Sequence, residues 1–352
     1  MKYPRTVSVI IPTYNRAHYL GEAIESILNQ DIRDCQIEII VVDDGSTDNT
    51  KEALRKFGDR VRYIYQDNCG AGPARNRGIN EATGEWVAFL DSDDRWLPGK
   101  LSLQFRVLDA FPDYNAIHSD FLIFDETGIF SNKGLKYWLS EPSVWENIIW
   151  GNIYAKRYES ADYHIHAMSG SFPIYAGNIF ATQLNVNCIC AWTLLVRRNC
   201  FEKGIRFAEN YKLNEDYWFS CRLTERWDVI FMDIATAENR AHNGPRLTQA
   251  GYIEKFNTHI DICNKIYRSS DSIHRPSDKE IDKTYKILNI LLFKKYLKDG
   301  MLSEARTTND VIRMINEPVG DRTYILYWLT LLFPFRVIKF LITIKNFIKN
   351  RL

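Results

Sequence analysis

The chain has 352 residues, 45% of them hydrophobic, which is enough for one large domain or two smaller domains with a real core. Its formal net charge of +1 at pH 7 gives no reason to expect a nucleic-acid partner. The seven cysteines have no regular spacing, which indicates reduced thiols in the cytosol. Residues 1–6 lead directly into a strand pattern, so we expect no signal peptide.

Short apolar runs alternate with helical patterns at the start of the chain. Strands are expected at 7–11, 37–42, 61–65 and 86–90, and helices at 17–29, after Asp48, and at 73–84. This alternation predicts an α/β fold with a doubly wound, mostly parallel sheet flanked by helices and joined by right-handed crossovers.

Polar residues follow these strands, at the edge where open α/β sheets bind ligands. Acids follow the second strand at 43–44 and the fourth at 91–94, and a loop with two glycines follows the third at 68–73. Because clustered carboxylates repel one another, we expect a hard divalent cation to join the group at 91–94. The alternative is an acidic turn before a helix that begins at Pro98.

These loops together suit a nucleoside diphosphate with its cation. Gly70 and Gly72 allow the backbone to approach a ligand closely, and Arg75 and Arg77 can face phosphate. A dinucleotide site fits less well because no glycine-rich turn follows the first strand. The chain has no Walker lysine motif, which argues against a P-loop enzyme.

The middle of the chain is less regular. A helix is expected at 98–110 and a strand at 116–124, whose direction is left open. Aromatic residues accumulate from 125 to 184, which predicts a small subdomain or a site, where the rings either pack the interior or form an acceptor platform. His164 and His166 are placed on one face of a strand, without a third metal ligand nearby. We interpret Cys188 and Cys190 as buried strand thiols.

Further elements follow up to the C-terminal helices. They are a strand at 192–196, a helix at 214–225, a strand at 229–232, a polar loop at 239–243, and helices at 248–267 and 279–297. Glu215 and Asp216 fall in the first turn of their helix, where the helix dipole stabilises acids.

The last residues differ in composition from the rest. Residues 324–335 carry no charge, and polar residues then recur every three to four positions up to Asn350. This pattern predicts an amphipathic helix with a basic stripe that lies in a membrane interface, because the uncharged part is too short to span a bilayer. Packing on the core or a dimer contact is the alternative.

Four segments in order resemble the motifs of the family 2 glycosyltransferases, which have the GT-A fold: 9–16, 41–48, 72–78 and 89–94. Segments 214–216 and 240–242 are similar to two downstream motifs of that family. The resemblance is strong over 6–124 and fair over 185–247, whereas the aromatic middle and the tail match no motif.

The resemblance implies an inverting transfer of sugar from a nucleotide sugar, usually a UDP-sugar, to an acceptor hydroxyl. It assigns the nucleotide sugar to Pro12, Thr13, Tyr14, Arg16, Asp44, Arg75, Asn76, Asp91 and Ser92. Asp44 would accept from the uracil N–H, and Asp93 would bind Mn²⁺ or Mg²⁺. His242 would ligate the metal or contact the diphosphate. Asp216 would be the general base, with Glu215 beside it as the alternative.

We expect residues 1–124 to bind the nucleotide sugar and 125–247 to bind the acceptor and carry the base. Residues 248–322 would be a C-terminal helical extension and 323–352 a membrane-associating tail. The expected enzyme is cytoplasmic and peripheral at the inner face of the cell membrane, and its acceptor is a glycan or lipid-linked glycan for surface polysaccharide. A nucleotidyltransferase is disfavoured because the loop after the first strand lacks glycines, and an inactive sugar-binding or scaffold protein is the alternative.

Overall fold

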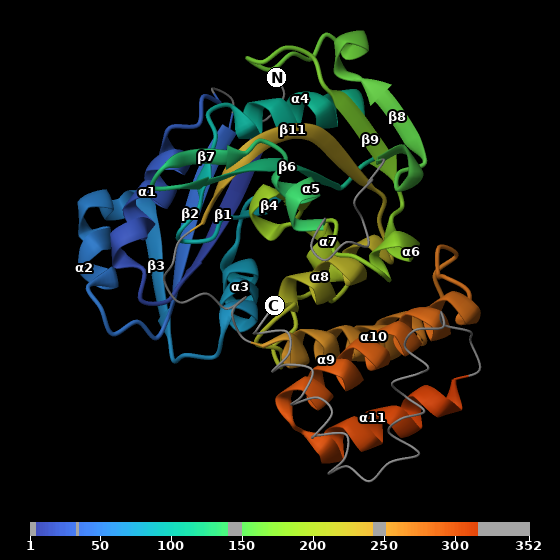
Figure 1. The fold of residues 1–352 in the computed structure, drawn as a ribbon. Coiled ribbons are helices and arrows are strands. Elements are labelled where there is room, and N and C mark those ends of the chain that lie inside the picture. The colour runs from blue at the N-terminus through green and yellow to red at the C-terminus, as the bar shows by residue number, and fades with distance from the viewer. Residues whose placement is uncertain (1–4, 33–34, 140–149, 242–250, 316–352) are drawn as a thin grey trace. The chain divides into compact units, whose positions relative to one another are not determined.

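The computed structural model describes residues 5–32, 35–139, 150–241 and 251–315 (Figure 1). The chain forms two compact units, residues 1–245 and 246–352, which are described separately. The predicted tail at 323–352 lies outside the described residues, and the predicted finer division of the chain stays a prediction.

Strands and helices alternate in the first part of unit 1. Their bounds are β1 (Arg5–Thr13), α1 (Ala17–Leu28), β2 (Cys35–Asp44), α2 (Thr50–Leu54), the 3-10 segment η1 (Arg55–Arg60), β3 (Val61–Gln66), α3 (Ala71–Glu81), β4 (Trp86–Phe89), β5 (Arg95–Trp96) and α4 (Lys100–Ala110). The last seven residues of β1, the last six of β2 and all of β4 are buried. Such continuous burial is typical of parallel strands that are covered on both faces.

The first four strands pair in the order β3-β2-β1-β4, and every pair is parallel. The chain moves outward from β1 to β2 and β3, then returns to the other side of β1 to form β4. The strand order therefore reverses between β1 and β4, which is where open α/β sheets bind ligands. The predicted doubly wound parallel sheet is confirmed.

The second part of unit 1 extends the same sheet. Its elements are β6 (Ala116–Asp125), β7 (Gly128–Ser131), α5 (Gly134–Leu139), η2 (Trp150–Asn152), β8 (Lys156–Glu159), η3 (Ser160–Tyr163), β9 (Pro173–Gly177), α6 (Phe180–Gln183), η4 (Ala191–Thr193), β10 (Leu195–Arg197), α7 (Asn199–Glu202), α8 (Glu215–Thr224) and β11 (Val229–Arg240). β10 lies between β4 and β6 and is antiparallel to both, and β11 is parallel to β6. Short β10 thus joins the two parts into one sheet of mixed direction.

Some predicted elements of the middle region are wrong. His164 follows the 3-10 helix η3 with φ 55°, so His164 and His166 do not share a strand face. Trp192 belongs to the 3-10 helix η4, and the predicted strand begins only at Leu195. Cys188 and Cys190 are buried as predicted but lie outside a strand. Short buried apolar runs do not reveal their secondary structure by periodicity, which explains these errors.

Helix α4 begins two residues later than predicted, because Gly99 adopts the left-handed conformation with φ 79°. Its first residue, Lys100, is buried, and burial lowers the pKa of its ammonium group well below the usual range. Lys100 Nζ donates to Gln104 Oε1 at 2.7 Å and to the carbonyl oxygen of Thr193 at 3.0 Å. The lysine therefore fixes η4 to the start of α4.

Unit 2 is helical, with α9 (Tyr252–Ile262), the π-helical turn η6 (Cys263–Tyr267), α10 (Asp278–Asp299) and α11 (Leu302–Met314). α10 opens with a capping box, in which the Ser277 side chain accepts from the Glu280 N–H and the Glu280 carboxylate accepts from the Ser277 N–H. The predicted helices at 248–267 and 279–297 are present over their described parts, and α11 was not predicted. No helix in the described ranges is long and apolar enough to cross a membrane.

Candidate active site

The loops after β1 and β2 are fastened to each other at the carboxyl edge of the sheet. Asn15 Oδ1 accepts from the backbone N–H groups of Thr47 at 2.8 Å and Asp48 at 3.3 Å. The Asn15 N–H donates to Ser46 Oγ at 2.9 Å. Asn15 has φ 52°, a conformation that Asn tolerates better than most residues. These hydrogen bonds therefore hold the loop after β1 and the loop after β2 in a fixed arrangement.

Asp44 lies buried at the end of β2 and is held by the loop that follows β3. Its carboxylate accepts from Gln66 Nε2 at 2.7 Å and from the N–H groups of Cys69 at 2.9 Å and Gly70 at 2.7 Å. A carboxylate has about four acceptor positions, so one remains for a ligand donor. Sequence reasoning found Asp44 but not Gln66, which only β2–β3 pairing brings alongside it.

A buried arginine links the two predicted groups of acids. Arg75 on α3 donates to Asp91 Oδ1 at 2.6 Å and to Glu215 Oε1 at 2.7 Å. Its guanidinium also lies over the Phe207 ring, 5.2 Å from the centroid. The arginine is 5% exposed, so this chain of charges is shielded from water. It ties the end of β4 to the start of α8.

Helix α3 packs directly against the segment that leads to α8. A Cβ on Gly72 would lie 2.2 Å from the Ala208 carbonyl oxygen, so only glycine fits there. The Asn76 amide donates to the Phe207 carbonyl at 2.9 Å and accepts from the Phe207 N–H at 2.9 Å. The structure therefore gives Asn76 an internal contact, and its predicted role at the nucleotide stays a prediction.

The three acids after β4 have different surroundings. Asp94 is buried and accepts from the Arg240 N–H at 2.9 Å and from Asn239 Nδ2 at 3.1 Å. Burial, followed by the charges of Asp93 and Asp91, raises the pKa of Asp94 well above its usual range. Through these hydrogen bonds, Asp94 holds the end of β11 beside the loop that follows β4. The strand reaches the site two residues before His242, which lies outside the described residues.

Asp93 fits a metal that arrives with its ligand. The Asp93 side chain is partly exposed, and its Oδ2 lies 3.6 Å from Arg16 Nε. Within the described part of the chain, no group of three or more His, Cys, Asp or Glu could hold a metal by itself. Mg²⁺ is often bound by one or two carboxylates together with substrate phosphates and water. The partly exposed carboxylate of Asp93 is compatible with such shared binding, and its role at a metal stays a prediction.

The two adjacent acids of α8 are separated by their partners. Glu215 is buried and committed to Arg75, whereas Asp216 accepts from the Tyr217 N–H at 2.8 Å and lies 3.4 Å from Asn187 Nδ2. Burial first, and then the charge of Glu215, raise the pKa of Asp216 to about 7. Asn187 was missed by sequence reasoning because nothing in its local pattern places it near Asp216.

The remaining predicted nucleotide residues lie on the β1 and β4 ends. Pro12 and Thr13 complete β1, and Thr13 Oγ1 is buried without a hydrogen-bond partner among the described residues. Tyr14 follows them and is exposed, and Ser92 is buried between Asp91 and Asp93. An orphaned hydroxyl beside an exposed aromatic ring is a suitable surface for a base or ribose.

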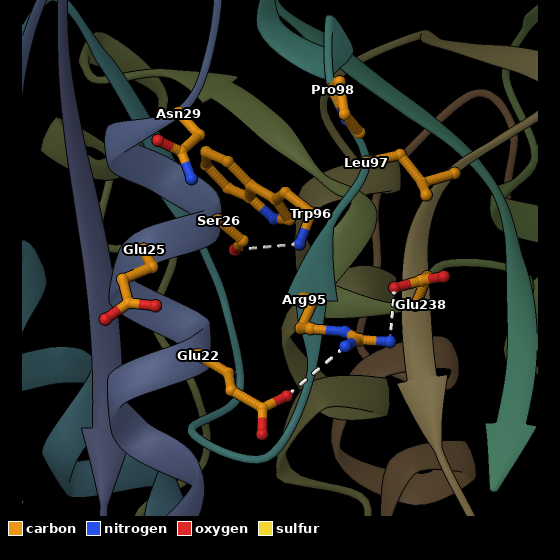
Figure 2. Close-up of a pocket in the computed structure, with 9 residues that line it drawn as sticks. All are labelled: Glu22, Glu25, Ser26, Asn29, Arg95, Trp96, Leu97, Pro98 and Glu238. Atoms are coloured by element: carbon orange, nitrogen blue, oxygen red, sulfur yellow. Dashed lines mark hydrogen bonds and ion pairs between the residues drawn. The ribbon is translucent and has the colours of Figure 1, made fainter.

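A separate pocket lies between α1, β5 and β11 and contains none of the predicted site residues (Figure 2). It has a volume of about 460 Å³, and Glu22 and Glu238 lie on either side of Arg95 in its wall. Arg95 pairs with Glu22 at 3.3 Å and with Glu238 at 2.9 Å, so the cation that faces these acids is already supplied. The pocket therefore does not compete with the carboxyl edge as the candidate site.

Comparison with known proteins agrees with this arrangement. The model of glycosyl transferase family 2 matches residues 8–205. A Campylobacter jejuni protein named GalNAc(5)-diNAcBac-PP-undecaprenol beta-1,3-glucosyltransferase is 43% identical over 138 residues, covering 37% of this chain and 43% of the relative. The chain spans between 26% and 65% of the length of the uncharacterised Rickettsia glycosyltransferases that it matches.

Two solved structures share the fold at low sequence identity. Residues 1–349 of S. aureus TarS, in complex with UDP-GlcNAc, have a TM-score of 0.58 at 17% identity, covering 88% of this chain and 81% of that TarS fragment. The mannosyltransferase PcManGT from Pyrobaculum calidifontis, in complex with GDP-Man and Mn²⁺, has a TM-score of 0.50 at 17% identity, covering 97% of this chain and 85% of that one. These likenesses confirm the predicted GT-A fold. The family model covers more than half of this chain, so the chain belongs to the family 2 glycosyltransferases.

Proposed function

We propose that the chain transfers a sugar from a nucleotide sugar to an acceptor hydroxyl, with inversion at the anomeric carbon. The observation that carries this proposal is the placement of Asp216. It is a carboxylate of raised pKa at the start of α8, joined through Glu215 and Arg75 to the acids at the carboxyl edge of β4.

Asp216 is the better of the two candidate bases. An alcohol is a weak nucleophile, so a base must take its proton as the new bond forms, and a base works best when its pKa lies near the working pH. The Oε1 atom of Glu215 is already occupied, because it accepts a hydrogen bond from the buried guanidinium of Arg75 at 2.7 Å. With Asp216 opposite the leaving group, attack inverts the anomeric centre and needs no covalent intermediate.

The donor is proposed to lie across the ends of β1, β2 and β4. Asp44 would accept from a uracil N–H with its remaining acceptor position, and UDP is supported by the UDP-GlcNAc complex of TarS. Asp93, with His242, would hold Mn²⁺ or Mg²⁺, which PcManGT supports through its Mn²⁺ complex. When bound, the ion would neutralise the charge that grows on the departing diphosphate.

The acceptor is proposed to be a glycan or lipid-linked glycan in surface polysaccharide synthesis. The Campylobacter jejuni relative is named for an undecaprenol-linked glycan, which supports this class of acceptor. Association with the inner face of the cell membrane through residues 323–352 is proposed from their basic amphipathic pattern.

Donor hydrolysis tests the proposal without knowledge of the acceptor, because water can take the sugar slowly. We expect the protein to release nucleotide from one member of a panel of UDP-, GDP- and TDP-sugars in Mn²⁺, and to lose this activity in excess chelator. Restoration by added Mn²⁺ is the control for damage by the chelator. Failure to hydrolyse or bind any of these donors would support the inactive scaffold of the same fold instead.

The pKa of Asp216 predicts the pH dependence of transfer. The base acts in its deprotonated form, so we expect kcat to fall about tenfold per pH unit below the pKa of Asp216, which lies at about 7, and to level off above it. Glu215→Gln removes a negative charge beside Asp216, so this variant should shift the acidic limb to lower pH. A limb that stays in place in Glu215→Gln would assign the titration to another group.

A further inference from the structure

Four large apolar side chains are exposed on the strand β7 and the helix α5 of unit 1. Ile129 and Phe130 lie on β7, and Tyr137 and Trp138 lie on α5. The rings of Phe130 and Tyr137 are 5.9 Å apart, so the two elements present one surface, which we call the aromatic patch. Contiguous exposed apolar side chains on a soluble domain commonly mark a binding surface.

Helix α5 is fixed to the central sheet, beside β6 (Figure 1). The buried carboxylate of Asp120 on β6 accepts from the Leu135 N–H at 2.9 Å. A Cβ on Gly134 would lie 2.3 Å from the Phe121 ring, so the helix begins in direct contact with β6. Lys133 forms an ion pair with Asp233 on β11. The patch is therefore preorganised, although its helix is short.

The patch is connected to the acids at 91–94 through one tryptophan. The ring of Trp138 lies 5.2 Å from that of Trp192 at an interplanar angle of 68°. Trp192 is held in turn by Trp96, whose indole N–H donates to the Trp192 carbonyl oxygen at 3.0 Å, and Trp96 lies two residues after Asp94. The segment on which Trp138 packs is thus tied to the short strand that follows the acids at 91–94.

Two buried polar atoms on residues that contact α5 have no hydrogen-bond partner within the described ranges. They are the indole Nε1 of Trp192, a donor, and Oδ2 of Asp120, an acceptor whose closest cation is Lys133 Nζ at 3.9 Å. Both side chains are more than nine-tenths buried. Buried polar groups are nearly always paired, so these atoms indicate a hydroxyl or bound water that belongs at this place.

We propose that Trp138 is the floor of the acceptor subsite, on which a pyranose ring of the acceptor glycan stacks with its C–H face. The buried atoms Trp192 Nε1 and Asp120 Oδ2 then pair with bound water. The proposal rests on the proposed glycosyl transfer and names the part of the protein that selects its acceptor. Trp138 places the sugar, and Asp216 takes the proton from its hydroxyl.

A membrane contact is the competing use of an exposed aromatic surface. The charges near the patch give it no net positive charge, because Asp125 and Glu126 form the turn before β7, Lys133 is paired with Asp233, and Lys136 on α5 is the further cation beside Tyr137. Acidic side chains are repelled by anionic lipids. A sugar face carries no charge and meets no such penalty.

Saturation-transfer NMR with methyl glycosides tests the proposal, using the full chain with UDP and Mg²⁺. The probes are methyl β-glycosides of glucose, galactose and their N-acetylamino analogues. We expect protons of one face of at least one glycoside to receive saturation from the protein. Trp138→Ala should weaken that binding roughly 3- to 10-fold, and Trp138→Phe should retain most of it. Tyr163→Ala, which removes another exposed ring that packs on Phe111 at 4.8 Å, should change nothing.

The outcomes separate this proposal from the proposed function. If the protein binds UDP but no glycoside, or if Trp138→Ala binds glycoside as well as the unmodified chain does, the subsite is wrong and glycosyl transfer stands. If the protein binds neither UDP nor glycoside, both proposals fail. If Trp138→Ala loses sedimentation with phosphatidylglycerol vesicles and keeps glycoside binding, the patch is a membrane contact and the subsite is wrong.

Discussion

Asp216→Asn is expected to lower the rate of sugar transfer by about 10²–10⁴-fold, the range that a general base contributes. The amide has nearly the same shape and can still accept from the Tyr217 N–H through its oxygen, but it cannot take a proton. UDP binding should be unchanged, because the proposed nucleotide contacts lie on β1, β2 and β4. Donor turnover and calorimetric titration with UDP measure the two effects.

The result is informative because Glu215 lies next to Asp216. Near-normal turnover in Asp216→Asn would move the role of base to Glu215, despite its ion pair with Arg75. Loss of UDP affinity together with activity would instead show that Asp216 supports the nucleotide site. Asn187→Ala, which removes the amide 3.4 Å from Asp216, should have a smaller effect on turnover.

Arg75→Met is expected to lower the free energy of unfolding by roughly 3–5 kcal/mol, the usual cost of removing one partner from a buried ion pair. The guanidinium is buried between Asp91 and Glu215, and its removal leaves two carboxylates without their shared cation. Methionine matches the stem of arginine as far as the position of Nε, so the packing of the stem is kept and the cost is chiefly that of losing the guanidinium. Denaturation by urea, followed by circular dichroism, measures the change.

Arg77→Met on the same helix is the matched control. Arg77 is exposed and pairs with Glu81 at 3.0 Å across one helical turn. Such exposed pairs contribute roughly 0.3–0.5 kcal/mol, so this variant should unfold almost as the unmodified protein does. Equal losses of stability in the two variants would contradict the buried charge chain as a source of stability.

The sequence allowed the parallel part of the fold and the chemistry of its edge to be predicted. Strands such as β1 and β4 are apolar throughout and end in polar residues, a pattern that predicts both their burial and the position of the site. The type and order of the residues therefore singled out Asp44, Asp93 and Asp216, whose roles stay predictions. The partners of Asp44 and Asp216 could not be predicted, because Gln66 and Asn187 meet these two acids only through strand pairing and loop packing.

The middle of unit 1 was harder to predict for a physical reason. Its strands are short, and segments such as 188–190 are buried without regular structure of their own. Their conformation is set by tertiary contacts, for example the hydrogen bond from Lys100 to the Thr193 carbonyl. Such contacts override local propensity and leave no periodic signal in the sequence.

The position of β10 has a consequence for the order in which the chain folds. β1 to β4 pair only with one another and with β10, so this parallel part can form once residue 89 has emerged from the ribosome. β6 cannot join it until Leu195–Arg197 is available to bridge them, and β6 meets β11 only after Val229. Pairings between distant segments are slow to form. We therefore expect the parallel pairings to form early during synthesis, whereas the contacts of Asp94 with β11 and of Arg75 with α8, which carries the proposed base, are added late.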